Sequence, residues 1–246
     1  MQRKSPQVFA RKSVVWVVGS SRGIGREIAE QFSFLGLNVC CSGRNRKELA
    51  ATVKSIWEKG GTAFSFPCDI RHPRTVRAAA VAIVRQVGDI DVLVNNAGIT
   101  VFKSFTSTTE SEFSAILTTN LLGPVSCIKA VLPSMMKRKH GWIINILSNA
   151  AVKVFEGSTA YTASKAGMLG LSRVLREELR PHGVKVVNVI PGATATGMWS
   201  RSDLRKYNRR MMSAKGVAES VVAAYTMPDD VVVDEIRLRP LQGDID

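Results

Sequence analysis

Two residues spaced four apart, Tyr161 and Lys165, can carry acid–base chemistry. On a helix this spacing places both side chains on one face. A tyrosine can give a proton to a carbonyl oxygen while a hydride reaches the carbonyl carbon, but its free pKa of about 10 is poorly matched to neutral pH. A cation about 4 Å away stabilises the phenolate by roughly 4 kcal/mol, enough to lower that pKa by about two to three. Taken alone, however, such a pair is more often an ordinary surface pair.

A serine and a glycine-rich turn give this pair a chemical context. Ser148 ends an apolar run at 142–148 and can hydrogen-bond the substrate oxygen. Gly19, Gly23 and Gly25 follow the first apolar run and open a segment of helical period. Glycine there permits positive φ and close approach of the backbone to a pyrophosphate, which the helix N-terminus also attracts. Many such turns use glycine for steric reasons alone, but a position after the first strand of a βα repeat favours a nucleotide site.

A cationic stretch follows the second apolar run, at 37–41, and indicates which nucleotide binds. At this place an acidic residue accepts hydrogen bonds from a free 2′-hydroxyl, whereas an arginine accommodates a 2′-phosphate. Arg44 is the residue at this place, and Arg22 in the glycine turn can approach the same phosphate from the other side. The two arginines therefore predict NADP(H). Arg46 and Lys47 are predicted to be only the solvated start of a helix.

Alternating strands and helices are predicted to bring these positions together. Seven short apolar or alternating runs are predicted strands: 14–18, 37–41, 62–66, 90–94, 142–148, 184–190 and 231–238. Between them, residues 23–36 and 48–59 have helical period, and a capping box of Thr109 with Glu112 opens a helix that runs toward Asn120. This order predicts the α/β class: a single Rossmann-like doubly wound domain, with a seven-stranded parallel sheet and helices on both faces.

Three motifs in a fixed order carry a family resemblance. The G-x3-G-x-G turn, NNAG at 95–98 and YTASK at 161–165 together resemble the short-chain dehydrogenase/reductase family, over about residues 13–240. Val18 replaces the threonine that often precedes the first glycine, and the C-terminus lacks the frequent Asp-Gly-Gly ending. The resemblance implies one such domain at 13–246 that reduces a carbonyl with NADP(H). It leaves the substrate and the number of subunits open.

The resemblance also implies a role for each matching residue. Asn120 is similar to the family residue that holds a water in the proton relay, and Lys165 to the lysine that also binds the nicotinamide ribose. The implied catalytic residues are Asn120, Ser148, Tyr161 and Lys165. The implied cofactor-binding residues are Gly19, Ser21, Arg22, Gly23, Ile24, Gly25, Arg44, Asp69, Ile70, Asn96, Ala97, Gly98, Tyr161, Lys165, Pro191, Gly192 and Thr196.

Family position distributes these contacts along the cofactor. Asp69 and Ile70 resemble the pair that flanks adenine, and residues 96–98 resemble the turn that lines the adenine ribose. Thr196 resembles the threonine that holds the nicotinamide carboxamide. For Asn95 we expect a structural role in supporting the central sheet.

The sequence says less about the substrate. Residues 197–216, predicted to be the substrate lid, combine Met198 and Trp199 with six cations. A basic lid near an apolar slot suits an acyl chain on an acidic carrier, so a 3-oxoacyl-ACP reductase-like enzyme is the first assignment. A small aromatic ketone suits it equally, and the ending EIRLRP…GDI is similar to bacterial sepiapterin reductase-type members. A non-catalytic NADPH-binding regulator is the alternative of another class, and the presence of all four catalytic residues disfavours it.

The net charge of +14 is concentrated in two segments. Residues 1–12, predicted to be a basic arm, carry +4, and residues 197–216 carry +5. A solvated basic surface is the simplest interpretation, and attraction of an anionic or carrier-bound carbonyl substrate is the sharper one. Nucleic-acid binding is not expected, because no recognised nucleic-acid-binding module accompanies the charge.

Composition and sequence pattern also bear on location, metal binding and oligomeric state. The chain has no uninterrupted apolar run of about 18 residues and no signal-peptide pattern, so no membrane span and a cytoplasmic location are expected. The four cysteines form no metal-ligand pattern and are expected to be structural, with no metal site. Helices near 109–138 and 161–180 are expected to pair chains into a homodimer or homotetramer. The apolar residues expected there include Leu169, Leu171, Val174 and Leu175.

Overall fold

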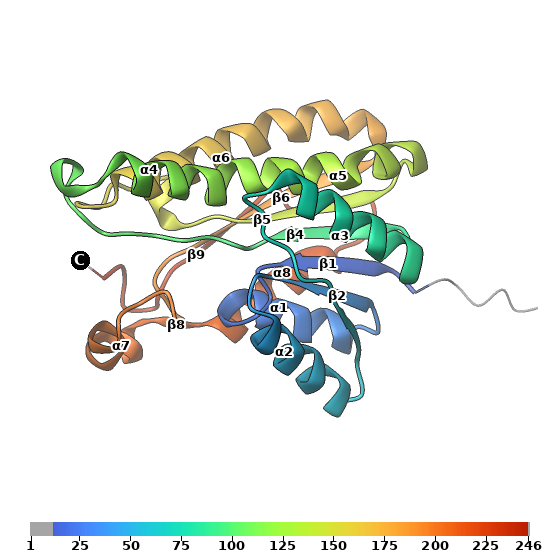
Figure 1. Ribbon diagram of the computed structural model, residues 1–246, viewed down its shortest axis with the longest axis horizontal. Helices are drawn as coiled ribbons and strands as arrows, with labels where there is room; N and C mark the ends of the chain where they lie inside the picture. Colours follow the sequence, from blue (N-terminus) through green and yellow to red (C-terminus); the bar gives the residue numbers. More distant parts are fainter. Residues whose placement is uncertain (1–11, 246) are drawn as a thin grey trace, which may run out of the picture.

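Seven parallel strands form a sheet at the centre of the protein (Figure 1). The structure is a computed structural model and describes residues 12–245, so the predicted basic arm at 1–12 lies outside the described residues except for Lys12. The sheet has the order β3-β2-β1-β4-β5-β6-β9. Its strands are β1 (Val14–Val18), β2 (Asn38–Ser42), β3 (Thr62–Ser65), β4 (Ile90–Asn95), β5 (Gly141–Ile146), β6 (Val184–Pro191) and β9 (Glu235–Leu238).

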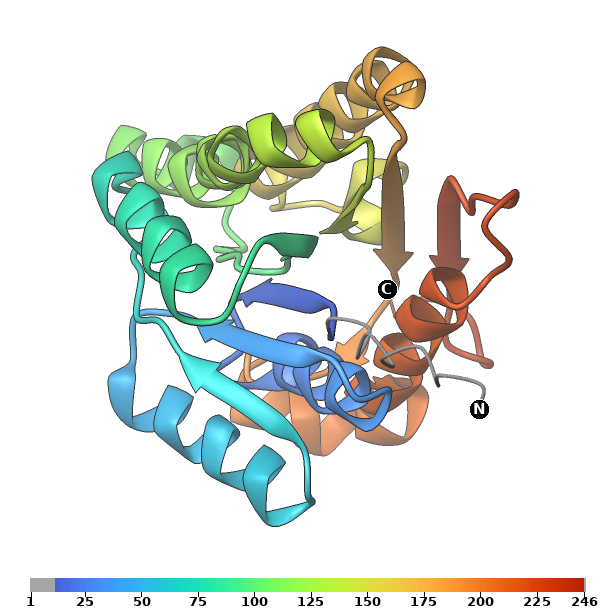
Figure 2. The ribbon, with the colours of Figure 1, turned by 90° about the vertical axis from the view of Figure 1, so that its right-hand side faces the viewer.

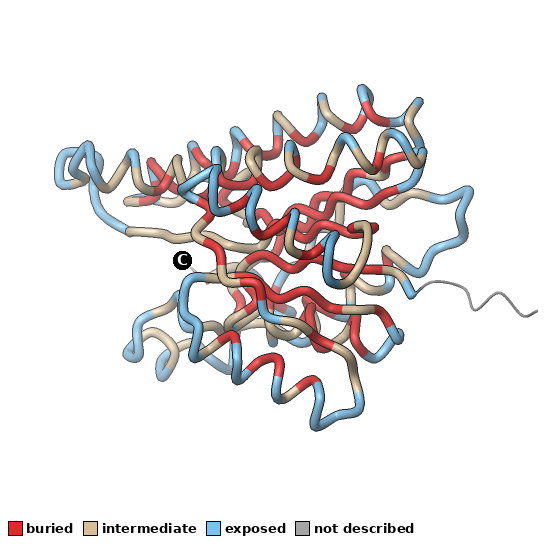
Figure 3. The backbone as a smooth tube through the Cα atoms, turned by 45° about the vertical axis from the view of Figure 1, so that its right-hand side comes forward, coloured by how far each residue is buried: buried red, intermediate tan, exposed pale blue. Residues whose placement is uncertain are grey.

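Helices cover both faces of this sheet (Figures 1 and 2). One face carries α1 (Gly23–Phe34), α2 (Arg46–Glu58) and α8 (Ala214–Tyr225), and the other carries α3 (Pro73–Gln86), α5 (Gly123–Arg138) and α6 (Thr159–Leu179). Successive residues of β1 point to opposite faces, so Val15 and Val17 pack with α1 while Trp16 packs on the other side. Every residue of β1 is buried, and Figure 3 shows buried residues along the central strands of the sheet. The predicted α/β doubly wound architecture is confirmed.

The strand order reverses beside β1, which pairs with both β2 and β4. The loops after β1 and β4 therefore leave toward opposite faces and open a crevice at the carboxyl edge of the sheet, the usual ligand position in such folds. Polar bonds fix the strands there: Trp16 Nε1 donates to Ser42 Oγ over 2.8 Å, and Ser42 Oγ donates to the Phe66 carbonyl over 2.6 Å. This chain of bonds ties together the ends of β1, β2 and the residue after β3.

A second polar chain crosses the central strands. Asn95 Nδ2 donates to Asn145 Oδ1 over 2.9 Å, and Asn145 Nδ2 donates to Ser172 Oγ over 3.0 Å. The expected structural role of Asn95 agrees with this contact, which joins β4 to β5 and, through Ser172, to α6.

A long helical segment, Glu110–Arg138, carries one of the site residues. It begins with α4 (Glu110–Leu117), whose predicted capping box is present: Glu112 N donates to Thr109 Oγ1 and Thr109 N donates to Glu112 Oε2. A π-helical turn at 118–122 then leads into α5. By length and composition alone this segment could cross a membrane, but core residues of α5 such as Cys127 and Val131 pack against the sheet, so we interpret it as a core helix.

All seven predicted strands are present; the first has the predicted ends, and the other six have shifted ends. The run predicted at 142–148 forms a strand only to Ile146, which leaves Ser148 in the following loop. The run at 231–238 becomes a strand only from Glu235. All four cysteines are free and buried, in line with the structural role expected of them.

Candidate active site

The glycine turn after β1 is held by backbone contacts that leave no room for side chains. Gly19 has φ +85°, and a Cβ there would lie 2.6 Å from the Cα and N of Ala97. A Cβ on Gly25 would collide with the Gly19 carbonyl and the Asn96 amide, while Asn96 Nδ2 donates to Gly19 O over 2.8 Å. Gly23, with φ +57°, lies against Thr196 at the start of α1. The turn therefore brings its backbone close to whatever occupies the space in front of it.

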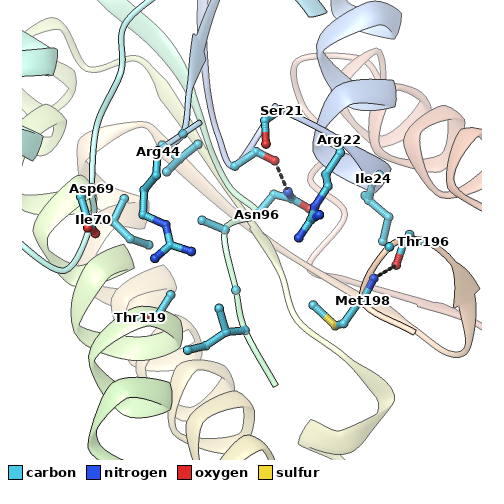
Figure 4. A pocket seen from close by; sticks show the side chains of 18 of the residues that line it. Ser21, Arg22, Ile24, Arg44, Asp69, Ile70, Asn96, Thr119, Thr196 and Met198 are labelled. Carbon is cyan, nitrogen blue, oxygen red and sulfur yellow. Dashed lines mark hydrogen bonds between the residues drawn. The ribbon is translucent and has the colours of Figure 1, made fainter. Parts of the chain in front are cut away.

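That space is a cleft of about 360 Å³ at the carboxyl edge of the sheet (Figure 4). The predicted cofactor-binding residues that line it are Gly19, Ser21, Arg22, Gly23, Ile24, Arg44, Asp69, Ile70, Asn96, Ala97, Gly98 and Thr196. The predicted ones that do not line it are Gly25, Tyr161, Lys165, Pro191 and Gly192. Gly25 lies behind the turn, against the Gly19 carbonyl, and the other four lie outside the cleft lining.

Two arginines converge on the cleft from different elements. Arg22 caps the N-terminus of α1, and Arg44 follows β2; Figure 4 shows both side chains reaching into the same space. Asn45, next to Arg44, caps α2 by accepting hydrogen bonds from Lys47 N and Glu48 N. Arg46 and Lys47 are exposed in the first turn of that helix, as predicted.

The predicted adenine end of the cleft carries an ion pair that the sequence did not reveal. Arg71 forms a bidentate ion pair with the Asp69 carboxylate, in which Nη2 donates to Oδ2 over 2.6 Å and Nε donates to Oδ1 over 3.0 Å. Hydrogen bonds from Arg71 lower the pKa of Asp69, against an opposing effect of burial, and the charge of Arg44 lowers it further. Asp69 is therefore an already paired carboxylate, and Arg71 adds a cation to the cleft lining.

Two threonine hydroxyls in the cleft lining were also missed. Thr100 Oγ1 and Thr119 Oγ1 are buried and have no hydrogen-bond partner among the described residues. Buried hydroxyl groups are normally hydrogen-bonded, so these two are available to a ligand. Thr119 directly precedes Asn120, and no spacing rule distinguishes it from any other helical threonine.

The loop after β6 joins the cleft to the lid. Pro191 is the last residue of β6, and Gly192 N donates to the Leu238 carbonyl over 2.8 Å, which anchors the turn to β9. Further along, Met198 N donates to Thr196 Oγ1 over 3.4 Å (Figure 4). The predicted lid at 197–216 then contains α7 (Arg201–Tyr207) and β8 (Met212–Ser213), and α8 begins at Ala214. The short strand β8 pairs with β7 (Thr194–Ala195), which lies just before the lid.

Tyr161 and Lys165 lie on one buried face of α6, as their spacing predicts. Lys165 Nζ donates to the Ile146 carbonyl over 2.9 Å and lies 5.8 Å from the centre of the Tyr161 ring. A Cβ on Gly98 would lie 3.7 Å from this Nζ and 3.3 Å from Asn120 Oδ1. The NNAG turn that lines the cleft thus meets Lys165 and Asn120 at one point.

Burial, rather than the lysine, dominates the pKa of Tyr161. Burial raises that pKa above its ordinary value of 10, and a hydrogen bond with Ser148 opposes the rise. Burial also lowers the pKa of Lys165 to about 8. The expectation that Lys165 lowers the pKa of Tyr161 is therefore wrong for the protein alone. The physical reason is that the ammonium group bonds to a backbone carbonyl while the phenol lies in a desolvated position.

Asn120 sits in the π-helical turn, with both hydrogens of its amide group engaged. Its Oδ1 accepts from Ile99 N over 2.9 Å, and its Nδ2 donates to Ile99 O and to Ser164 Oγ. π-turns inside α-helices are frequent at functional sites. Because both amide hydrogens are used, Asn120 fixes the loop after β4 to α6, and Ser164 is a supporting residue that the sequence did not indicate.

Ser148 begins the turn after β5 and faces Tyr161. It caps the short 3₁₀ turn Asn149–Ala151, with Ala150 N donating to its Oγ over 3.2 Å. The same hydroxyl takes part in the hydrogen bond that lowers the pKa of Tyr161. The four predicted catalytic residues thus come from the loop after β5, from α6 and from the π-turn.

Exposed apolar side chains occur on the loop after β4 and on the loop after β5. The Phe102 ring lies 6.3 Å from the Tyr161 ring, centre to centre, and is 57% exposed. Val152 and Val154, in the loop after β5, are also exposed, and Lys103 N donates to Gly157 O to join the two loops. Between residues 12 and 245, no group of three or more His, Cys, Asp or Glu side chains is arranged to hold a metal ion.

Sequence comparison finds relatives along nearly the whole chain. A family model described as short chain dehydrogenase matches residues 13–206. Sepiapterin reductase of Chlorobaculum tepidum is 34% identical over 241 residues, which cover 95% of this chain and 98% of that protein. A 3-oxoacyl-[acyl-carrier-protein] reductase of Staphylococcus epidermidis is 35% identical over 214 residues, covering 86% of this chain and 88% of the relative.

Solved structures with the same architecture include cofactor complexes. A metagenomic short-chain oxidoreductase in complex with NADP matches with a TM-score of 0.82 at 34% identity, covering 93% of this chain and 96% of its own. An actinorhodin polyketide ketoreductase variant with NADPH matches with a TM-score of 0.86 at 29% identity, covering 92% and 95%.

Proposed function

Since the chain belongs to the short-chain dehydrogenase/reductase family and is an oxidoreductase, we propose that it reduces a ketone or aldehyde to an alcohol with NADPH. The observation that carries this proposal is the grouping of Tyr161, Ser148, Lys165 and Asn120 next to the cleft, where Gly98 of the cleft lining meets Lys165 and Asn120. A phenol, a hydroxyl and a buried ammonium group around one point suit proton donation to a carbonyl oxygen.

The cleft fits a phosphorylated dinucleotide by shape and by charge. Gly19 has a conformation and a close backbone contact that exclude any side chain from the cradle. The buried Thr119 hydroxyl lacks a protein partner, and Arg22 and Arg44 enter from two sides. Guanidinium groups bind phosphate in a bidentate way, so we assign these two arginines to the 2′-phosphate and propose NADP(H) over NAD(H).

The other predicted contacts keep their family assignments in this proposal. Asp69 and Ile70 would lie at adenine, Asn96 to Gly98 at its ribose, and Pro191 to Thr196 at the nicotinamide. When bound, the nicotinamide supplies a hydride to the carbonyl carbon. Lys165, with a pKa of about 8, is largely protonated at neutral pH and places a positive charge beside the ribose and Tyr161.

Proton donation is the contribution of the residues around Tyr161. Because its pKa is raised, the phenol is protonated at neutral pH and can donate its proton to the carbonyl oxygen. Ser148 would hold that oxygen by a second hydrogen bond. Asn120 has both amide hydrogens engaged, so a relay water would have to use the remaining lone pair of Oδ1 or the Asn120 carbonyl.

For the substrate we propose a 3-oxoacyl thioester or a similar carbonyl compound with an apolar body. Phe102 offers apolar surface beside Tyr161, and Val152 and Val154 are exposed in the loop that begins at Ser148. The lid helix α7 carries exposed Arg201 and Arg205, which suit an anionic or carrier-bound substrate. The Chlorobaculum sepiapterin reductase, similar over 95% of this chain, supports a pterin side-chain ketone as the second candidate.

Pairing of α5 and α6 with a second chain stays part of the proposal, as does a cytoplasmic location. Val174 on α6 is 61% exposed, and Leu122, in the π-turn just before α5, is 55% exposed, which supports an apolar contact. Leu171 and Leu175 are half-buried. Leu169, however, is buried in the core, so its expected place in the contact is wrong.

The test is NADPH oxidation by the purified protein with 3-oxoacyl thioesters, pterin ketones, diketones and aldehydes. Tyr161→Phe should lower turnover by about a hundred- to ten-thousandfold, the usual contribution of a positioned acid, and leave NADPH affinity unchanged. Tyr225→Phe is the matched control, because Tyr225 packs its ring on Phe32 in α1, away from the cleft. NADPH binding without turnover of any carbonyl would favour the non-catalytic regulator instead.

A further inference from the structure

A single carboxylate near the C-terminus is buried and fully hydrogen-bonded. The Asp244 side chain is only 8% exposed. Its Oδ1 accepts from Asn149 Nδ2 over 3.1 Å, and its Oδ2 accepts from Lys153 Nζ over 3.1 Å and from Arg239 Nη2 over 2.7 Å. Burial raises the pKa of Asp244, but these bonds and charges outweigh it and lower the pKa below its ordinary value. The carboxylate is therefore charged at neutral pH.

Two of these donors bracket the turn that begins at Ser148. Asn149 directly follows Ser148, and Lys153 N donates to the Asn149 carbonyl over 2.9 Å, so Asn149 and Lys153 close one compact turn. Ala150 N, inside this turn, donates to Ser148 Oγ. By holding both ends, Asp244 fixes the direction in which the Ser148 hydroxyl points.

The same residue also reaches the lid. Arg210 Nη2, in the last 3₁₀ turn of the lid, donates to the Asp244 carbonyl over 3.2 Å. Arg239, the third donor to the carboxylate, follows β9, whose Leu238 anchors the turn that leads into the lid. One residue thus joins the serine turn, the lid and the end of β9, while none of its four partners lines the cofactor cleft.

We infer that Asp244 is a positioning residue, which holds the Ser148 turn and the lid in the arrangement that reduction requires. The inference rests on the proposed role of Ser148 in holding the substrate oxygen. It predicts that loss of the carboxylate slows the chemical step and leaves cofactor binding intact, because none of the four residues bonded to Asp244 lines the cofactor cleft.

The test is Asp244→Asn, which keeps the side-chain size and removes the charge. We expect kcat to fall by about ten- to a hundredfold, as misplacement of a reacting group does, with the Kd for NADPH unchanged. Amide hydrogen exchange should speed up in residues 148–157 and 204–212. The matched control is Glu235→Gln, which removes the ion pair at 2.8 Å between Glu235 on β9 and Arg173 on α6. This control should change neither kcat nor hydrogen exchange in those two segments.

A reciprocal variant separates positioning from general destabilisation. Asn149→Asp combined with Asp244→Asn restores an amide–carboxylate bond in the opposite direction, and we expect it to recover part of the lost kcat. Should Asp244→Asn not fold, Asn149→Ala removes one bond from the partner side and is judged by the same kcat and Kd measurements. A kcat equal to that of the wild type, or a loss matched by weaker NADPH binding, would overturn the inference. A wild-type protein that reduces no carbonyl compound would instead overturn the proposed function.

Discussion

The cofactor side and the substrate side of this site differ in the contacts that hold their residues in place. The cofactor cleft is walled by strand ends and by a glycine turn whose backbone packs directly on Ala97. The substrate side consists of loops that expose Phe102 and Val154 and are joined by side-chain bonds such as those of Asp244. Backbone packing leaves almost no freedom to vary the first side, whereas the second can change its side chains without disturbing the sheet.

Of all parts of the site, the glycine turn should therefore tolerate substitution least. Gly19→Ala places a Cβ 2.6 Å from the Ala97 backbone at a φ of +85°, so the turn must move. We expect a loss of about 1–3 kcal/mol in the free energy of unfolding from backbone strain alone. NADPH binding should weaken by tenfold or more, since about 1.4 kcal/mol of lost contact corresponds to that factor. Chemical denaturation and fluorescence titration with NADPH measure both.

Gly43→Ala is the matched control in the same cleft lining. A Cβ at Gly43 would meet its nearest neighbour, Leu49, at 3.6 Å, which is ordinary van der Waals contact. It should leave stability and NADPH affinity close to wild type. Equal effects of the two substitutions would show that the close backbone packing at Gly19 does not set cofactor affinity.

Lys165 lies where the cofactor side and the substrate side meet. We expect it to destabilise the folded state although turnover requires it. Its pKa is lowered from 10.5 to about 8 by burial, so the folded state binds this proton less well than the unfolded state does. That difference corresponds to about 3 kcal/mol of destabilisation, fully present below pH 8 and relieved as the pH rises from 8 toward 10.5. Lys165→Met also removes the hydrogen bond from Nζ to the Ile146 carbonyl, and this loss offsets about 1 kcal/mol of the stability gained by removing the buried charge.

We therefore expect Lys165→Met to unfold at a higher temperature than wild type at pH 7, with an advantage that shrinks toward pH 10, while turnover is lost. Thermal unfolding across this pH range measures the effect. A variant less stable than wild type at pH 7 would mean that Lys165 is stabilised by contacts that outweigh its desolvation.

The sequence predicted the cofactor side well because periodicity and glycine spacing are local properties. The seven strands, the capping box at Thr109 and the meeting of Arg22 with Arg44 at one cleft all follow from such patterns. Arg71 escaped prediction because its pairing with Asp69 depends on side-chain direction in a loop. The pKa of Tyr161 was predicted with the wrong sign because burial, a property of the tertiary structure, outweighs the neighbouring charge.

We expect cofactor choice to depend on Arg22 and Arg44, two exposed side chains in the cleft lining. Arg44→Asp replaces the donor assigned to the 2′-phosphate by an acceptor suited to a 2′-hydroxyl. Charge-assisted hydrogen bonds contribute about 1.5–3 kcal/mol, so NADPH affinity should fall by about ten- to a hundredfold, with a shift toward NADH. Arg46→Asp, an exposed change in the first turn of α2, should leave the NADPH-to-NADH ratio of kcat/KM unchanged. Equal use of both cofactors by the wild type would contradict the assignment of Arg44.

The smallest effect is expected on the substrate side, at Phe102. Its ring lies beside Tyr161 yet is 57% exposed, so Phe102→Ala removes apolar contact for a substrate without opening a buried cavity. A loss of about 1 kcal/mol raises the KM for an apolar ketone roughly fivefold, with kcat and the Kd for NADPH unchanged. Phe34→Ala is the control, because Phe34 is 55% exposed at the end of α1, away from Tyr161. If Phe102→Ala lowered kcat instead of raising KM, this ring would act by orienting Tyr161, and the substrate side would be less free to vary than its exposure indicates.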